Sequence, residues 1–198
     1  FDEDVKGWTS FFDYKPTFVT SLNSSFYSFF DGKIWKHHSG SYGNFYGTTY
    51  NSDVTLLLNS QPSTVKVFQT INYEGATGWE LQSMVGSSGD LSLPISPFIP
   101  PSDGLDSSGI ADGSVVSLNN LEALEQNIWA NNFKRKENKF FANLINNSGA
   151  TAGEVLWGAQ ASGLKGFWST VKMKLNNTTY NVKKELFAVS SDTVESSY

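Results

Sequence analysis

The stretch that decides the fold is a pair of aromatic runs separated by Asp-Gly: Phe26-Tyr27-Ser28-Phe29-Phe30-Asp31-Gly32-Lys33-Ile34-Trp35-Lys36-His37. Asp-Gly between two such runs favours a type I′ hairpin, because that turn needs a positive φ angle at both central residues. With Asp31 and Gly32 in the turn, Phe30 lies opposite Lys33. The sequence therefore predicts an antiparallel β-hairpin at this point.

Both faces of this hairpin are apolar. In the predicted register, one face carries Tyr27, Phe29 and Ile34, and the other carries Phe26, Phe30 and Trp35. An antiparallel sheet with one face in water normally alternates apolar and polar residues. We therefore expect the hairpin to be covered on both sides, within the domain or by a partner. Phe26, Phe30 and Trp35 are candidate interface residues.

The composition is rich in aromatics and poor in charge. Of 198 residues, 15% are aromatic and 17% are charged, against about 25% charged in a typical globular domain. This excludes a disordered chain. The absence of cysteine excludes disulfide frameworks, thiolate metal sites and cysteine nucleophiles. A net charge of −5 argues against nucleic acid as the main ligand, and no apolar run is long enough to span a membrane.

Strand-like patterning flanks a long irregular segment. The expected strands are 54–58, 64–73 with a return strand at 79–85, a second hairpin over 128–145, and 166–175 followed by 180–189. A helix is expected over 117–128, where Leu118, Leu121 and Leu124 form one stripe. The predicted fold class is mainly β, with antiparallel sandwich or propeller-like sheets, one short helix and a long arm rich in Pro, Gly and Ser.

The expected organisation has three parts. Residues 1–85 form a β-rich aromatic hairpin region, 86–117 form the arm, and 118–198 form the short helix and further hairpins within one domain with 1–85. The arm holds four prolines in eight positions, which favours extended chain. Because Ile95, Phe98 and Ile99 are too apolar to lie free in water, we predict that they dock on another surface.

No residues form a recognisable catalytic or cofactor-binding motif, and none is predicted. His37 and His38 are neighbours on a strand and point to opposite faces, so they do not chelate one metal together. Glu74 and Glu80 flank a turn beside Trp79, which resembles the acid pair of a sugar-cleaving site only loosely. The simpler interpretation is a pair of solvated turn carboxylates.

Two further groups are candidates for binding. Exposed aromatics stack sugars, and the candidate residues for glycan stacking are Trp79, Tyr42, Tyr46 and Tyr50. Packing in a core or an interface is the favoured alternative for these rings. The basic segment 134–136 with Lys139 is interpreted as a solvated hairpin tip or as half of a charge contact between subunits.

The two ends of the chain also suggest hypotheses. The chain starts with Phe1 and an acidic segment rather than Met, which suggests a processed product or a fragment, with Phe1 as a hypothetical maturation cleavage site. The polar end with Tyr198 is interpreted as a solvated tail or as a strap over a neighbour, which makes Tyr198 a candidate interface residue.

Several phrases together carry a family resemblance. They are Lys6-Gly7-Trp8-Thr9-Ser10-Phe11-Phe12-Asp13-Tyr14-Lys15-Pro16, the hairpin phrase from Phe26 to His37, Asn44-Phe45-Tyr46-Gly47, Lys66 to Gly75, Phe133 to Lys139, and Lys184 to Ser191 with the ending Ser197-Tyr198. As a set they resemble the C-terminal region of large virion structural proteins of tailed bacteriophages, such as marine cyanophages and crAss-like phages. Such proteins belong to the tail, in muzzle, nozzle or baseplate-like positions.

The resemblance implies a non-enzymatic structural component of the virion tail, made in the cytoplasm of the bacterial host. The expected partners are other virion or tail proteins, with copies of the chain forming a ring or tube through buried aromatic interfaces. None of the matching phrases is catalytic, so no active-site residue or cofactor follows from them. Two alternatives remain open, a host-glycan-binding tail module and a polysaccharide-degrading domain.

Overall fold

A computed structural model describes residues 3–4, 6–7, 11–98, 132–147, 163–180 and 182–196. The chain divides into two compact units, Phe1–Tyr50 and Asn51–Tyr198. Every named strand pair within the described residues is antiparallel, and these residues contain no helix, closed barrel or propeller. The mainly β antiparallel class is therefore confirmed. The helix predicted over 117–128 lies outside the described residues, as do Ile99 and Tyr198.

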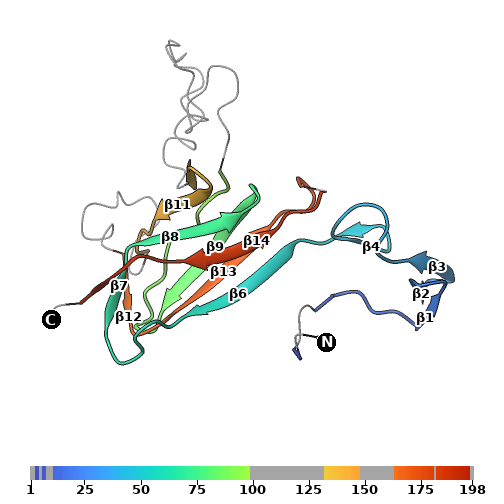
Figure 1. The fold of residues 1–198 in the computed structure, drawn as a ribbon, viewed down its shortest axis with the longest axis horizontal. Coiled ribbons are helices and arrows are strands. Elements are labelled where there is room, and N and C mark those ends of the chain that lie inside the picture. Colours follow the sequence, from blue (N-terminus) through green and yellow to red (C-terminus); the bar gives the residue numbers. More distant parts are fainter. Residues whose placement is uncertain are drawn as a thin grey trace, which may run out of the picture. The chain divides into compact units, whose positions relative to one another are not determined.

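Unit 1 contains the hairpin that dominates the sequence. Its three-stranded sheet has the order β1 (Phe18–Leu22), β2 (Ser25–Phe30), β3 (Lys33–Lys36), and a two-stranded ribbon follows with β4 (Asn44–Phe45) and β5 (Thr48–Thr49) (Figure 1). Phe30 pairs with Lys33, as the sequence predicts. Asp31 and Gly32 have φ angles of 51° and 68°, so both central residues of the turn are left-handed as a type I′ turn requires.

The described residues of unit 2 form three sheets. A four-stranded sheet has the order β10 (Lys134–Lys136), β11 (Lys139–Asn143), β8 (Thr70–Gly75), β14 (Leu186–Ser190). A three-stranded sheet has the order β6 (Ser52–Leu58), β13 (Ser169–Leu175), β9 (Trp79–Gly86). A smaller sheet has the order β12 (Leu164–Gly166), β7 (Lys66–Phe68), β15 (Thr193–Glu195). In Figure 1, β14 lies beside β8, its neighbour in the four-stranded sheet, and β6 lies beside β13, its neighbour in the three-stranded sheet.

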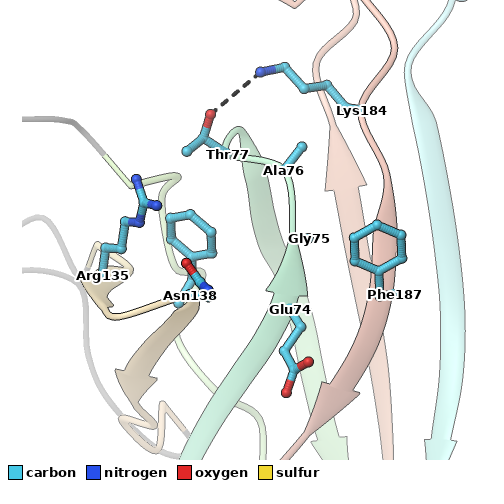
Figure 2. A pocket seen from close by; sticks show the side chains of 9 residues that line it. Glu74, Gly75, Ala76, Thr77, Arg135, Asn138, Lys184 and Phe187 are labelled. Carbon is cyan, nitrogen blue, oxygen red and sulfur yellow. Dashed lines mark hydrogen bonds between the residues drawn. The ribbon is translucent and has the colours of Figure 1, made fainter.

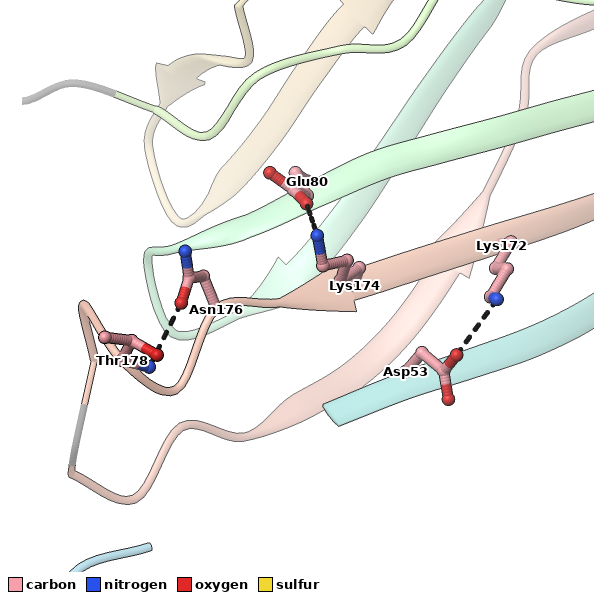
Figure 3. Close-up of polar contacts among 6 residues, drawn as sticks. All are labelled: Asp53, Glu80, Lys172, Lys174, Asn176 and Thr178. Atoms are coloured by element: carbon pink, nitrogen blue, oxygen red, sulfur yellow. Dashed lines mark hydrogen bonds and ion pairs between the residues drawn. The ribbon is translucent and has the colours of Figure 1, made fainter. Parts of the chain in front are cut away.

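One hydrophobic core joins these sheets. It includes Ile71 and Tyr73 of β8, Leu81 of β9, Phe140 of β11 and Met173 of β13. Burial alternates along β13 because successive side chains point to opposite faces of a strand. Two of the outward residues of the same strand are charged and paired: Lys172 pairs with Asp53 at 3.0 Å, and Lys174 pairs with Glu80 at 3.2 Å (Figure 3).

Long-range pairing differs from the sequence prediction in two places. The strand expected over 64–73 is divided at Gln69, and its halves, β7 and β8, pair in different sheets. The return strand expected at 79–85 forms as β9, but it pairs with β13 instead of β8. Gly75 and Gly78, with φ angles of 156° and 110°, lie in the turn that carries the chain from one sheet to the other.

The last predicted strand pair is also different. The strand expected at 180–189 begins only at Leu186, and it pairs with β8 instead of β13. The segment expected at 166–175 is interrupted before Ser169, so that β12 and β13 belong to different sheets. The strands on either side of residues 176–179 therefore do not form a hairpin with each other. Each is paired with a strand that lies far away in the sequence, β13 with β6 and β9, and β14 with β8.

The beginning of the predicted arm packs on the chain itself. Ile95 is 1% exposed and Phe98 is 8% exposed, and both belong to the core. Ile95 and Leu81 exchange backbone hydrogen bonds of 2.9 and 3.0 Å, which adds residue 95 to the edge of β9. The surface on which these two residues dock is therefore the core of unit 2.

Lys66 of β7 is a fully buried cation that faces carbonyl oxygens. Its Nζ donates to the backbone oxygens of Gln61, at 2.9 Å, and Thr64, at 3.2 Å, and also to that of Phe167. The three acceptors come from the loop before β7 and from the turn before β13. A buried ammonium must have its donors satisfied, so this contact fixes the two segments to each other.

Replacing Lys66 by Met tests this contact. Lys66→Met keeps the length of the side chain but leaves buried carbonyl oxygens without a donor, so we expect a loss of about 3 kcal/mol in the free energy of unfolding. Urea unfolding followed by tryptophan fluorescence measures the loss. Lys165→Met, at an exposed position on neighbouring β12, is the matched control and should change stability by no more than about 0.5 kcal/mol. Equal stability of the two variants would contradict the assigned role.

Candidate functional site

Unit 1 gathers most of its predicted site residues into one aromatic cluster. This cluster comprises Tyr14, Phe26, Phe30, Trp35, His37, Phe45 and Tyr46. Phe30 stacks on Tyr46 with ring centroids 4.5 Å apart, and Trp35 meets Tyr46 edge-on at 5.3 Å. Tyr42 is exposed and Tyr50 is half-buried. The cluster covers one face of the hairpin from within the unit.

A polar group lies at the centre of the aromatic cluster. The fully buried Ser28 hydroxyl lies 2.6 Å from His37 Nε2 and 2.8 Å from the Tyr46 hydroxyl. Ser28 can donate to a neutral His37 ring while it accepts from Tyr46. Because Ser28 has no exposed surface, this serine–histidine pair is suited to holding the β4–β5 ribbon on the hairpin rather than to attacking a substrate.

Burial changes the titration of this cluster. It lowers the pKa of His37, and the positive charge that His38 can carry lowers it further. Burial also raises the pKa of Tyr14, with a smaller contribution from Tyr46. His37 is therefore held in its neutral form, which is the form that accepts the Ser28 hydrogen bond.

The opposite face of the β1–β2–β3 sheet is apolar and open. Phe18 is 62% exposed, Leu22 is 63% exposed and Ile34 is 66% exposed. Phe18 pairs with Phe29, which pairs in turn with Ile34, so their side chains form a row across the three strands. We call Phe18, Leu22 and Ile34 the apolar face. None of the three is among the interface residues that the sequence suggested, although Ile34 belongs to one of the two faces predicted to be apolar.

The candidates near the β8–β9 turn lie in surroundings that do not favour sugar chemistry. Trp79 is 6% exposed and belongs to the core of unit 2, which does not fit a role in stacking a glycan. Glu74 pairs with Lys139 at 2.7 Å, and Glu80 pairs with Lys174 at 3.2 Å. Both carboxylates of the loosely predicted acid pair are thus bound to lysines.

The same turn borders a pocket of unit 2. This turn pocket has a volume of about 550 Å³ and is lined by residues of the turn, the β10–β11 hairpin and β14, as Figure 2 shows. Its lining comprises Glu74, Gly75, Ala76, Thr77, Arg135, Asn138, Phe140, Lys184 and Phe187. Three segments that are far apart in the sequence therefore build it.

Two cations flank the turn pocket. Arg135 lies 5.8 Å from the centre of the Phe140 ring, and Lys184 lies 5.1 Å from the centre of the Tyr180 ring while donating to the Thr77 hydroxyl at 3.4 Å. Neither is in an ion pair with a carboxylate among the described residues. The pocket therefore has a local excess of positive charge in a chain whose net charge is −5.

Phe187 gives the turn pocket an apolar wall. It is 73% exposed and lies between Leu186 and Ala188, where the pairing of β14 with β8 is shifted by a bulge. A bulge of this kind redirects a side chain out of the regular alternation. A single exposed phenyl ring is ordinary on a protein surface, so Phe187 is a candidate contact only because it lines this pocket.

Sequence reasoning missed Thr77, Lys184 and Phe187. A bulge on an edge strand and the approach of β14 to β8 leave no local pattern, so no motif could have indicated these residues. Arg135 was noticed as part of a basic segment, and that segment does form the hairpin tip, with strands β10 and β11 around Glu137 and Asn138.

The described parts of the chain contain neither a metal-binding group nor a membrane-spanning helix. Within the described parts of the chain, no group of three or more His, Asp or Glu side chains is arranged to hold a metal ion. Those parts also contain no helix that is both long enough and apolar enough to cross a membrane.

Comparison with known proteins adds independent information. Residues 40–95 match the family described as the Crassvirus muzzle protein C-terminal domain. The chain is similar to the C-terminal region of crAss-like phage muzzle proteins. This confirms the resemblance derived from the sequence phrases, and the match to the muzzle family continues into residues 86–95, for which those phrases gave no counterpart.

A curated relative gives the same result. The muzzle protein of Bacteroides phage crAss001 is 27% identical over 88 residues, which cover 44% of this chain and 6% of that protein. The chain thus spans a small part of the length of this relative. The family match over residues 40–95 includes Tyr46, Trp79 and the turn residues Glu74 to Thr77. Arg135, Lys184 and Phe187 lie outside that range.

The lowered pKa of His37 predicts a pH dependence for unit 1. Protonation of His37 is harder in the folded state than in the unfolded chain. The stability that neutral His37 contributes is therefore fully present above about pH 6.5, the ordinary pKa of histidine, and is lost as the pH falls through the lower pKa of the folded state. Thermal unfolding between pH 7.5 and 5.5, followed by near-ultraviolet circular dichroism, measures this. His37→Gln should flatten the profile, whereas His38→Gln should retain most of it. A parent profile that is already flat would contradict the assignment.

Proposed function

We propose that the chain is a non-enzymatic structural part of a bacteriophage virion and belongs to the tail. The observation that carries this proposal is the similarity to the muzzle protein C-terminal domain. The chain would be made in the cytoplasm of the bacterial host and would function in the assembled particle. Its partners would be other tail proteins and further copies of itself in a ring or tube.

The apolar face of unit 1 supports this proposal. Large apolar side chains in a row on a sheet are costly in water, and full burial of one such side chain is worth about 1.5–3 kcal/mol. Phe18, Leu22 and Ile34 would together supply a substantial part of the stability of a subunit contact. The candidates Phe26, Phe30 and Trp35 would support that contact from behind, because the aromatic cluster packs against the other side of the same sheet.

Unit 2 supports the proposal in a different way. Its sheets share one core, and we interpret this arrangement as an antiparallel sandwich that serves as a rigid support. The buried residues come from strands that lie far apart in the sequence, and such long-range packing resists local opening. A part that holds its place in a particle needs this rigidity more than it needs a deep active-site cavity.

The first test places the chain in the particle. Purified virions are analysed by quantitative mass spectrometry and by electron cryomicroscopy, and we expect peptides of this chain at a fixed copy number in tail density. Particles that lack the chain altogether would refute the virion role.

A second test concerns the apolar face. Ile34→Asp should leave the fold of unit 1 intact, because the side chain is exposed, and should lower incorporation into particles at least tenfold in a complementation assay. Leu57→Asp, at an exposed position on β6 of unit 2, is the matched control and should be incorporated normally. Circular dichroism verifies that both variants fold. Normal incorporation of Ile34→Asp would show that the apolar face is not an assembly surface.

A further inference from the structure

The turn pocket has features that an assembly role alone does not require. It combines two cations, one exposed aromatic ring, a hydroxyl and a side-chain amide within about 550 Å³. That volume lies within the range of roughly 300–1,000 Å³ that is usual for small-ligand sites. We propose that the turn pocket binds an acidic carbohydrate, that is, a sugar unit that bears a carboxylate. This inference does not depend on the virion role.

The charge of the pocket selects an anion. Arg135 and Lys184 are held in place by cation–π contacts with Phe140 and Tyr180, so their positions are partly fixed before any ligand arrives. The guanidinium of Arg135 keeps further N–H groups beyond the one that donates to the Glu137 backbone oxygen. A ligand carboxylate between the two cations would gain charge-assisted hydrogen bonds.

A neighbouring hollow on the same sheet provides a comparison. It is about 440 Å³ in volume and is lined by Lys136 and Lys139 together with the carboxylates of Glu137 and Asp192. Its positive and negative groups balance, and the aromatic ring in its lining, Phe141, is half-buried rather than strongly exposed. The turn pocket differs from it in both respects, which is why we assign the ligand to the turn pocket.

The remaining groups favour a sugar over an acidic peptide. The Phe187 ring is free to stack on the C–H face of a sugar ring, and the Asn138 amide and the Thr77 hydroxyl are suited to sugar hydroxyls. Glu74, already paired with Lys139, can accept further hydroxyl hydrogen bonds but would repel a carboxylate placed next to it. The ligand carboxylate would therefore lie toward Arg135 and Lys184, with the sugar hydroxyls toward Glu74.

The test is a titration of the complete 198-residue chain with trigalacturonic acid. Binding is measured by calorimetry and by changes in NMR chemical shifts. We expect saturable binding that weakens with salt, with shift changes at Thr77 and Phe187. The α-1,4-linked galactose trisaccharide, its neutral counterpart, should bind at least tenfold more weakly. Arg135→Gln and Lys184→Gln should each weaken binding of the acidic sugar about tenfold, and Phe187→Ala should also weaken it.

Lys183→Gln is the matched control, because it removes the same charge from the adjacent residue, whose partner is Glu185. Its affinity should equal that of the parent. No saturable binding of the acidic sugar by the parent chain would overturn the proposal, as would equal loss in all three charge variants. Triglutamate serves as the acidic peptide, and tighter binding of triglutamate than of the sugar at the same residues would replace the carbohydrate by a peptide ligand.

Discussion

Backbone pairing on both edges of β8 is the constraint on which unit 2 depends. Residues 70–75 pair with β11 on one side and with β14 on the other, so a single strand joins parts of the chain that are more than sixty residues away. Its inward side chains, Ile71 and Tyr73, are fully buried, and burial raises the pKa of the Tyr73 hydroxyl. Its outward side chain Glu74 pairs with Lys139. The turn pocket exists because the same pairing brings the β10–β11 hairpin and β14 to the turn that follows β8.

The sequence predicted local structure well and long-range structure poorly. Asp31 and Gly32 specify a two-residue turn by themselves, and the register of β2 and β3 follows from it. The second hairpin around Glu137 and Asn138 was also recognisable. In contrast, β8 and β9 are neighbours in the sequence but pair in different sheets, because the energy of burying both faces decides between partners that have similar strand patterns.

The candidate sites show the same division. The sequence predicted that both faces of the hairpin are apolar, and it offered Phe26, Phe30 and Trp35 as interface residues. In the structure these three belong to the aromatic cluster, and the more exposed apolar side chains lie on the opposite face. Trp79 could not be distinguished from an exposed tryptophan by sequence, since its burial depends on β13 and the core. The unmatched cations Arg135 and Lys184 become neighbours of one pocket only after folding, and the exposure of Phe187 results from a bulge.

The burial of Lys66 has a chemical consequence. An amine acts as a nucleophile only when a reagent can reach its nitrogen, and the Nζ of Lys66 is enclosed and donates to backbone oxygens of three residues. Acylating reagents should therefore modify exposed lysines such as Lys165 quickly and Lys66 only when the segments around it separate. The rate of acylation at Lys66 would then report the rate at which unit 2 opens. It can be measured on the one peptide that contains Lys66, even in an assembled particle.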